Sequence, residues 1–224
     1  AGPQGAAAGY GRPHWSWIGL EGSSSVSPAG AGAYGGLRLS TPFVNLRAGA
    51  RYTATANQHF LVPRETYGRD DLDHTTGPRL RYVTFEAEVA SGFPLLRGSV
   101  FGIAGIYRVF DTPAGYNYFD QSLQVVTEPP LLWRARVGYL ARVDRWDMLR
   151  LGAAVEVTGN PARGAVVVRA GPAITAMITH HLEAFGAALL VVSSPDTLGL
   201  AGAQIGELGF RYRWATGDRW PEIP

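Results

Sequence analysis

Residues 44–56, with the sequence VNLRAGARYTATA, alternate strictly between two kinds of side chain. The even positions, such as Val44, Leu46 and Tyr52, are apolar or small, and the odd positions include Arg47 and Arg51. Successive side chains of a β-strand point to opposite faces of its sheet. Alternation over the whole stretch therefore predicts a strand with one apolar face and one polar face.

The same period of two recurs along the chain, and no helical periodicity of useful length competes with it. We read segment 118–130 as a loop, because a strand there would put the two longest loops at opposite ends. Short links then alternate with longer ones, as in an antiparallel up-and-down sheet. We expect ten strands, at 14–23, 31–41, 43–56, 79–91, 97–110, 132–144, 148–158, 165–179, 182–193 and 200–214. They form a single domain over 14–214, preceded by a flexible segment 1–13 and followed by a tail, 215–224.

Composition excludes several classes of protein. The chain has 224 residues, including 29 Gly, and its 20 basic residues are all Arg, with a net charge of +2. So small a charge, with no long basic block, argues against a nucleic-acid partner. The sequence contains no Cys, which excludes disulfides, thiolate metal sites and cysteine nucleophiles. Residues 1–13 lack a charged segment followed by an apolar core, which is consistent with a mature protein whose signal peptide has been removed and also with a cytosolic protein.

Alternation alone does not show which face meets water, and four features favour a membrane barrel. The expected strands have about 10–15 residues, whereas soluble strands have about 5–6 and spanning strands need about 9–11. Long and short links alternate, aromatic residues such as Trp15, Phe43 and Trp133 lie near strand ends, and the polar face is rich in Gly and Ala. The sequence therefore predicts an all-β, antiparallel up-and-down transmembrane β-barrel of about ten strands, within a range of about 8–12. A soluble β-sandwich or lipocalin-like barrel is the alternative.

The last expected strand carries a more specific pattern, a polar residue, a Gly two positions on, and then aromatic or apolar residues at alternating positions. The run Glu207-Leu208-Gly209-Phe210-Arg211-Tyr212-Arg213-Trp214 resembles the C-terminal β-signal of bacterial outer-membrane β-barrel proteins. The resemblance implies location in the outer membrane and recognition by its barrel-assembly machinery. It assigns the assembly signal to Glu207, Gly209, Tyr212 and Trp214. The segment Ala215–Pro224 departs from the pattern, because the signal usually ends the protein. The residues indicate no narrower family.

The polar face of the expected barrel is rich in Arg. The arginines assigned to it are Arg38, Arg47, Arg51, Arg108, Arg134, Arg136, Arg142, Arg150, Arg169, Arg211 and Arg213. The acids assigned to it are Glu86, Glu88, Glu156, Glu207 and Glu183. A barrel of this size is narrow, and confined charges need partners because an ion loses much solvation free energy inside a protein.

The two long loops carry net negative charge that could balance this excess. Loop 57–78 contains Glu65, Asp70, Asp71 and Asp73 against two arginines, and loop 111–131 contains acids without Arg. We expect at least one loop to fold over the mouth and occlude it by electrostatic attraction. Solvated loops with counter-ions in the lumen, or an anion-selective pore, are the alternatives.

Candidate catalytic groups are sparse. Asp70, Asp71, Asp73 and His74 loosely resemble the paired acids and Asp–His pair of outer-membrane proteases such as the omptins. Those proteases carry the groups on different strands, so their roles do not transfer, and an acidic surface loop is the simpler interpretation. The run lacks the spacing of a known calcium loop, and His180-His181 lacks a third metal ligand. We expect no cofactor and no metal.

These observations favour a non-catalytic protein of the bacterial outer membrane. We expect a structural or adaptor component of the envelope, whose partners are the lipid bilayer with its lipopolysaccharide, the barrel-assembly machinery and other envelope proteins. A small anion-preferring channel is the first alternative. A hydrolase that uses the acidic loop is the second.

Overall fold

The structure, a computed structural model, describes residues 6–12, 16–27, 30–41, 43–73, 77–144, 148–179, 182–199 and 205–212. The chain is almost entirely β. Its strands are β1 (Ala6–Arg12), β2 (Ser16–Ser27), β3 (Gly30–Ser40), β4 (Val44–His59), β5 (Arg79–Leu95), β6 (Gly98–Phe110), β7 (Tyr118–Asp120), β8 (Val125–Thr127), β9 (Leu131–Arg142), β10 (Leu149–Asn160), β11 (Ala165–Met177), β12 (Leu182–Ser193) and β13 (Ile205–Tyr212). One short helix, α1 (Arg69–Asp73), lies between β4 and β5.

Eleven strands form one large antiparallel sheet, in the order β1-β2-β3-β4-β5-β6-β9-β10-β11-β12-β13. Every neighbour in the sheet is also the next strand of the sheet along the chain, so the topology is up-and-down. The prediction of an all-β, antiparallel sheet is confirmed. Segment 118–130 stays out of the large sheet, as expected, but it contains the separate two-stranded hairpin β7–β8.

The additional strand of the sheet comes from the N-terminal segment. Ala6–Arg12 pair with β2 as strand β1, although we placed the whole of 1–13 before the first strand. The sequence AAAGYGR has no alternation of apolar and polar side chains, because Ala and Gly fill most of its positions. The alternation of polarity therefore does not reveal this strand, which pairs with β2 through its backbone.

The two faces of the sheet have opposite character, and we call them the apolar face and the charged face. On β4, Leu46 and Tyr52 are 43% and 48% exposed on the apolar face. Arg47 and Arg51 alternate with them on the charged face, where both form ion pairs. Water-soluble domains bury their apolar side chains and rarely expose contiguous apolar patches of more than a few hundred Å². Along most of its strands this sheet instead exposes its apolar side chains and buries its charged ones.

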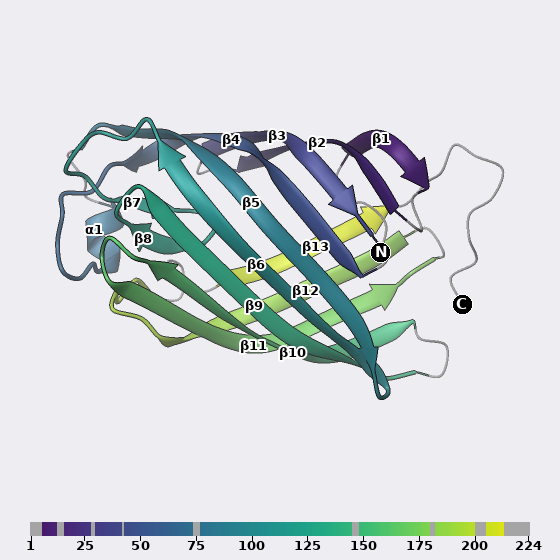
Figure 1. Cartoon of the computed structure of the whole chain (residues 1–224). Coiled ribbons are helices and arrows are strands. Elements are labelled where there is room, and N and C mark those ends of the chain that lie inside the picture. Colours follow the sequence, from purple (N-terminus) through teal and green to yellow (C-terminus); the bar gives the residue numbers. More distant parts are fainter. Residues whose placement is uncertain are drawn as a thin grey trace.

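The sheet is strongly curled, with β12 and β13 behind β4, β5 and β6 in Figure 1. Contacts on the charged face agree with the curl. Phe101 on β6 packs against the cluster of Ala154 on β10 and Leu189 on β12. In a flat sheet β6 and β12 would lie about 19 Å apart, at about 4.8 Å per strand step. The charged face is therefore the concave face.

The longer connections gather at one end of the sheet, where α1 and the β7–β8 hairpin lie (Figure 1). Backbone bridges join Leu61 to Asn117 and Gly68 to Thr197, so three connections are tied together. We call the residues 60–73, 116–128, 161–164 and 194–198 the loop cap. The opposite end has short turns, such as the two residues between β5 and β6.

Candidate functional site

An ion-pair network occupies the middle of the charged face. Glu86 and Glu88, neighbours on that face of β5, each lie close to two arginines. Arg47 Nη2 lies 2.6 Å from a Glu88 oxygen and 3.9 Å from a Glu86 oxygen, so it joins the two carboxylates. Arg51 donates to Glu86, and Arg134 Nη2 lies 2.9 Å from the other Glu88 oxygen. The network thus links β4, β5 and β9.

Two tyrosine rings fill the space beside these charges. The Tyr34 ring lies between the guanidinium groups of Arg47 and Arg51, whose central carbons are 5.5 and 5.3 Å from its centroid. A Cβ at Gly36 would lie 2.6 Å from the Tyr34 hydroxyl, so this glycine makes room for the ring. Tyr107 donates to Glu88, and the Arg134 guanidinium lies over its ring. The tyrosines thus occupy space within the curl that water would otherwise fill.

A second group of charges lies fully buried under the loop cap. Arg136 Nη2 and Arg169 Nη1 lie 2.7 and 3.1 Å from the two oxygens of Glu156. Both Arg169 and Glu156 are 0% exposed. Arg169 also donates to the backbone oxygen of Gln124 in the β7–β8 turn, at 2.7 Å. A buried carboxylate shared by two arginines therefore connects the sheet to the cap.

The cap meets the charged face through an aromatic and aliphatic core. Tyr118 on β7 is 0% exposed, and its ring centroid lies 4.7 Å from that of Tyr82 on β5. Phe60 makes an edge contact with Tyr118. The same core contains Leu80, Tyr107, Val109, Leu123, Val125, Leu132 and Val167. These residues come from β5, β6, β8, β9 and β11 and from segments of the cap, so the hairpin is packed against the concave face of the sheet.

The outer part of the cap is joined by Arg163 in the β10–β11 turn. Its Nη1 and Nη2 donate to both carboxylate oxygens of Asp196, at 2.8 and 2.7 Å. Its guanidinium stacks on the Tyr67 ring, with 4.9 Å between the central carbon and the ring centroid. The hydrogen bonds to Asp196 raise the pKa of Arg163, and burial raises the pKa of Tyr67. Arg163 thus ties together three connections of the cap.

Most residues expected on the charged face are found there. Besides the ion-pairing residues above, Arg38 contacts Glu21 at 3.0 Å, Arg150 lies 3.5 Å from the Ser99 hydroxyl, and Arg142 is exposed at the end of β9. Arg108 instead lies exposed on the apolar face, because Tyr107 and Val109 are the buried neighbours on β6. Segment 97–110 has mostly apolar side chains on both faces, so the charge of Arg108 alone did not show on which face it lies.

The expected assembly signal is described in its backbone up to Tyr212 and in only part of its side chains. The backbone of β13 pairs with β12 and includes Glu207, Gly209 and Tyr212. The side chains of Glu207, Arg211 and Tyr212 are not among the described ones, and neither are Arg213, Trp214 and the tail 215–224. The signal-like segment thus forms the last strand of the sheet, and its role in assembly stays a prediction.

Among the loop acids, Asp120 reaches the charged face, where it accepts a hydrogen bond from the Tyr82 hydroxyl at 3.4 Å and attracts Arg51 electrostatically. Asp71 pairs with Arg64 of its own segment and accepts from the Gly68 backbone N–H at 2.8 Å. Asp120 accepts from Ser122 and Leu123 of its own hairpin. The cap is therefore held mainly by its apolar core and by hydrogen bonds, and Asp120 adds an attraction to Arg51 of the kind that we expected.

The candidate catalytic residues are only partly described. Asp70 and Asp71 lie on α1, and Asp73 ends the helix with a side chain that is not described. His74, His180 and His181 lie outside the described residues. Within the described part of the chain, no three His, Asp or Glu side chains are placed to hold a metal ion.

Sequence analysis missed Glu21, Tyr34 and Tyr107 as members of the site. Ile18 and Leu20 are exposed on β2 while Glu21 is 5% exposed, so the alternation existed in the sequence. Trp15 and Trp17 obscured it, because they compete with Ile18 and Leu20 for the apolar face.

The comparisons with known proteins add no relative. No family model, curated protein or solved structure matches the chain. No helix in the described ranges is long and apolar enough to cross a membrane.

Proposed function

We propose that this chain is an integral β-barrel protein of the bacterial outer membrane, with an occluded lumen and a structural or adaptor role. The observation that carries the proposal is the reversed polarity of the sheet. Its convex face exposes Leu, Ile, Val and Phe, while its concave face buries paired Arg and Glu. A lipid-facing barrel requires this arrangement, and a water-soluble barrel requires its opposite.

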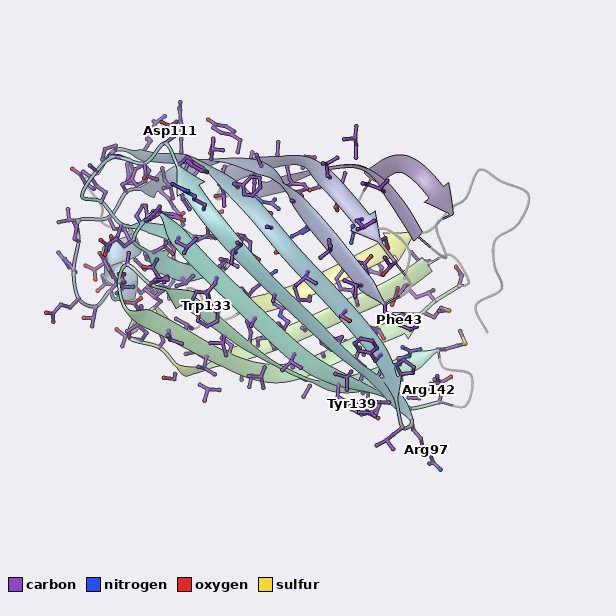
Figure 2. All side chains as sticks on the ribbon, viewed as in Figure 1. Phe43, Arg97, Asp111, Trp133, Tyr139 and Arg142 are labelled. Atoms are coloured by element: carbon purple, nitrogen blue, oxygen red, sulfur yellow. The ribbon has the colours of Figure 1, made fainter. Side chains whose placement is uncertain are left out.

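Aromatic side chains on the apolar face support a bilayer-spanning band. Phe85 and Phe110 lie toward the cap, and Phe43 and Phe93 stack toward the opposite end, with 5.9 Å between centroids. Figure 2 shows Phe43 near the short-turn end and Asp111, which follows Phe110, at the cap end. From Phe85 to Phe93 the strand rises about 27 Å, or about 21 Å along a barrel axis at the usual tilt. Outer-membrane barrels have an apolar band of about 25 Å between aromatic girdles.

Closure of the sheet into a barrel is part of the proposal. In an antiparallel series of eleven strands, β1 and β13 run in the same direction and would pair in parallel. Strands β2 and β13 run in opposite directions and would pair antiparallel, as in bacterial barrels with an even strand number. Closure of β13 on β2 gives ten strands, the number expected from the sequence, and requires β1 to leave the edge.

The interior of such a barrel would be occupied. Six arginines and four glutamates pair on the charged face, with tyrosine rings among them. The loop cap packs onto the same face at one end. A barrel of about ten strands has little space left for a channel. An occluded barrel leaves the outer wall and the exposed parts of the cap as the surfaces that can engage envelope partners.

Planar-bilayer recordings of the reconstituted chain test this proposal. We expect no steady conductance from the wild type and a conductance after replacement of 117–127 by a short Gly-Ser linker. Leu96→Ala is the matched control, because Leu96 is 92% exposed in the turn at the opposite end. A chain that stays monomeric in water without detergent would contradict the membrane assignment.

A small anion-preferring channel is the second candidate. The excess of arginines over glutamates in the network favours it, because a positive lining attracts anions. Steady wild-type conductance with anion selectivity would establish this function in place of the occluded barrel.

A further inference from the structure

The apolar face contains a groove of about 610 Å³ that spans β2 to β9. Its floor is made by the small side chains of Ala48, Ala87, Ala104 and Ala135. Ala48 and Ala87 are paired across β4 and β5, and Ala104 and Ala135 are paired across β6 and β9. Its volume lies within the range of about 300–1,000 Å³ that small-molecule sites occupy.

Larger side chains form the walls of this groove. Leu37 and Leu46 stand on one side, 56% and 43% exposed, and Ile106 stands on the other, 57% exposed. Trp133 borders the same side, and its ring covers Gly159 of the next strand. The groove is thus apolar throughout and open along its length, which suits a flexible hydrocarbon chain.

Two exposed arginines lie on the apolar face between the groove and the loop cap. Arg108 is the next residue after Ile106 on the apolar face of β6, and its guanidinium lies over the Phe110 ring at 5.3 Å. The side chain therefore extends toward the cap. Arg81 lies on the same face of β5, two residues before Val83, which is the partner of Phe110. Among described residues, neither arginine has a carboxylate within ion-pair distance.

We propose that this surface binds a membrane lipid with a phosphate headgroup, an inference that rests on the proposed membrane location. The acyl chain lies in the alanine-floored groove, and Arg108 and Arg81 bind the phosphate. Arginine forms charge-assisted and often bidentate hydrogen bonds with phosphate. An arginine on a lipid-facing wall extends its head to the interface and finds its counter-charge there.

The charge of the surface selects this occupant over a second copy of the chain. A symmetric dimer through the groove would bring two copies of Arg108 and Arg81 near one interface, and no described acidic side chain lies on the apolar face of the strands to pair with them. A phosphate headgroup supplies negative charge at the place where the arginines lie, and an acyl chain fills an open groove without specific polar contacts.

Native mass spectrometry of the detergent-solubilised chain tests the proposal. The probes are phosphatidic acid and the diacylglycerol with the same acyl chains, which lacks only the phosphate. We expect phosphatidic acid to stay bound and diacylglycerol to bind at least about tenfold more weakly, a factor equal to about 1.4 kcal/mol. Inorganic phosphate at the same concentration should not displace the lipid, because it lacks the chain.

Two pairs of variants separate headgroup from groove. Arg108→Gln with Arg81→Gln should lower phosphatidic acid binding about tenfold, whereas Arg97→Gln, an exposed arginine at the opposite end, should leave it unchanged. Ala104→Leu should reduce binding by filling the floor, whereas Ala153→Leu, on the apolar face outside the groove, should not.

Each outcome decides the matter. Equal binding by the double arginine variant and the wild type would overturn the proposal, as would equal effects of the two alanine variants. A lipid-free dimer that Ala104→Leu dissociates would assign the groove to a second copy. If the chain enters bilayers but shows none of these differences, the lipid site fails while the membrane location stands. If the chain remains soluble in water and does not enter bilayers, both the lipid site and the membrane location are wrong.

Discussion

The charged face is held in two different ways along its length. In its middle, Arg47 and Arg51 pair with glutamates while their side chains stay 27% and 21% exposed. Under the loop cap, Glu156 and Arg169 are 0% exposed, and Tyr118, also 0% exposed, belongs to an apolar core. The same alternation of side chains thus produces a partly hydrated ion-pair network in one region and a dry, protein-like core in the other. The cap makes the difference, because it excludes water.

The largest effect that separates the two regions should come from the buried carboxylate. Glu156→Gln keeps the shape of the side chain but removes the negative charge that Arg136 and Arg169 share. Breaking a buried ion pair costs about 3–5 kcal/mol. Urea unfolding in detergent should show this loss, and Arg47→Gln in the hydrated network should cost about 1 kcal/mol. Equal losses for both variants would remove the distinction between the regions.

The next effect should come from the core of the cap. Tyr118→Ala deletes a fully buried ring that contacts Tyr82 and Phe60, and large aromatic-to-alanine changes cost about 3–5 kcal/mol, with less lost where the surroundings collapse. We expect the β7–β8 hairpin to detach before the sheet unfolds. Limited proteolysis checks this: the rate of cleavage between 111 and 130 should rise in the variant, while the rate of cleavage in the rest of the chain should stay the same. A variant cleaved only upon global unfolding would show that the cap and sheet are one cooperative unit.

A smaller effect should follow from the outer connection of the cap. Arg163→Lys keeps the charge but loses the paired hydrogen bonds to Asp196 and the planar stacking on Tyr67. Hydrogen bonds to charged groups contribute about 1.5–3 kcal/mol. Hydrogen exchange at the backbone N–H of Tyr67, which donates to Asp196 at 3.0 Å, should accelerate while exchange in β10 stays unchanged. Unchanged exchange at Tyr67 would mean that Arg163 is dispensable.

The smallest effect should come from the Tyr118 hydroxyl, which has no hydrogen-bond partner among the described residues. Tyr118→Phe should change stability near neutral pH by about 0.5 kcal/mol or less, because no bond is lost. Burial raises the pKa of Tyr118 well above its usual value near 10. The unfolded chain therefore releases this proton first, and wild-type stability falls as pH rises above about 10.

The Tyr118→Phe variant has no hydroxyl to titrate, so its stability should fall less than that of the wild type as the pH rises above about 10. Urea unfolding at pH 8 and at pH 11 measures the difference between the two proteins. Parallel loss of stability in both would show that Tyr118 does not contribute to the alkaline transition.

The sequence predicted the parts of this structure that depend on local alternation. Residues 44–56 fall within β4, with Leu46 and Arg47 on the expected opposite faces. The pattern failed for Ala6–Arg12, which form a strand without alternating polarity. It also misplaced Arg108, because the residues around it on β6 are apolar or aromatic on both faces.

The loop cap could not be predicted in the same way, because its packing depends on contacts distant in the sequence. Tyr118 and Leu123 meet Leu80 and Val167 only after the sheet has curled. The expected attraction between the acidic loops and the interior arginines is found at Asp120, which attracts Arg51 and accepts a hydrogen bond from Tyr82. Asp71 bonds within its own segment, and the interior arginines that form ion pairs meet glutamates of the strands.

Site-directed spin labelling in lipid bilayers tests the central claim most directly, because the chain has no Cys and every introduced Cys is a unique label site. Labels at 46, 48 and 52 on the apolar face should be accessible to oxygen and shielded from a water-soluble nickel reagent. Labels at 45 and 53 on the charged face should be shielded from oxygen. A period of two in oxygen accessibility along β4 is the predicted result. High nickel accessibility at 46, 48 and 52 would place the apolar face in water and contradict the account.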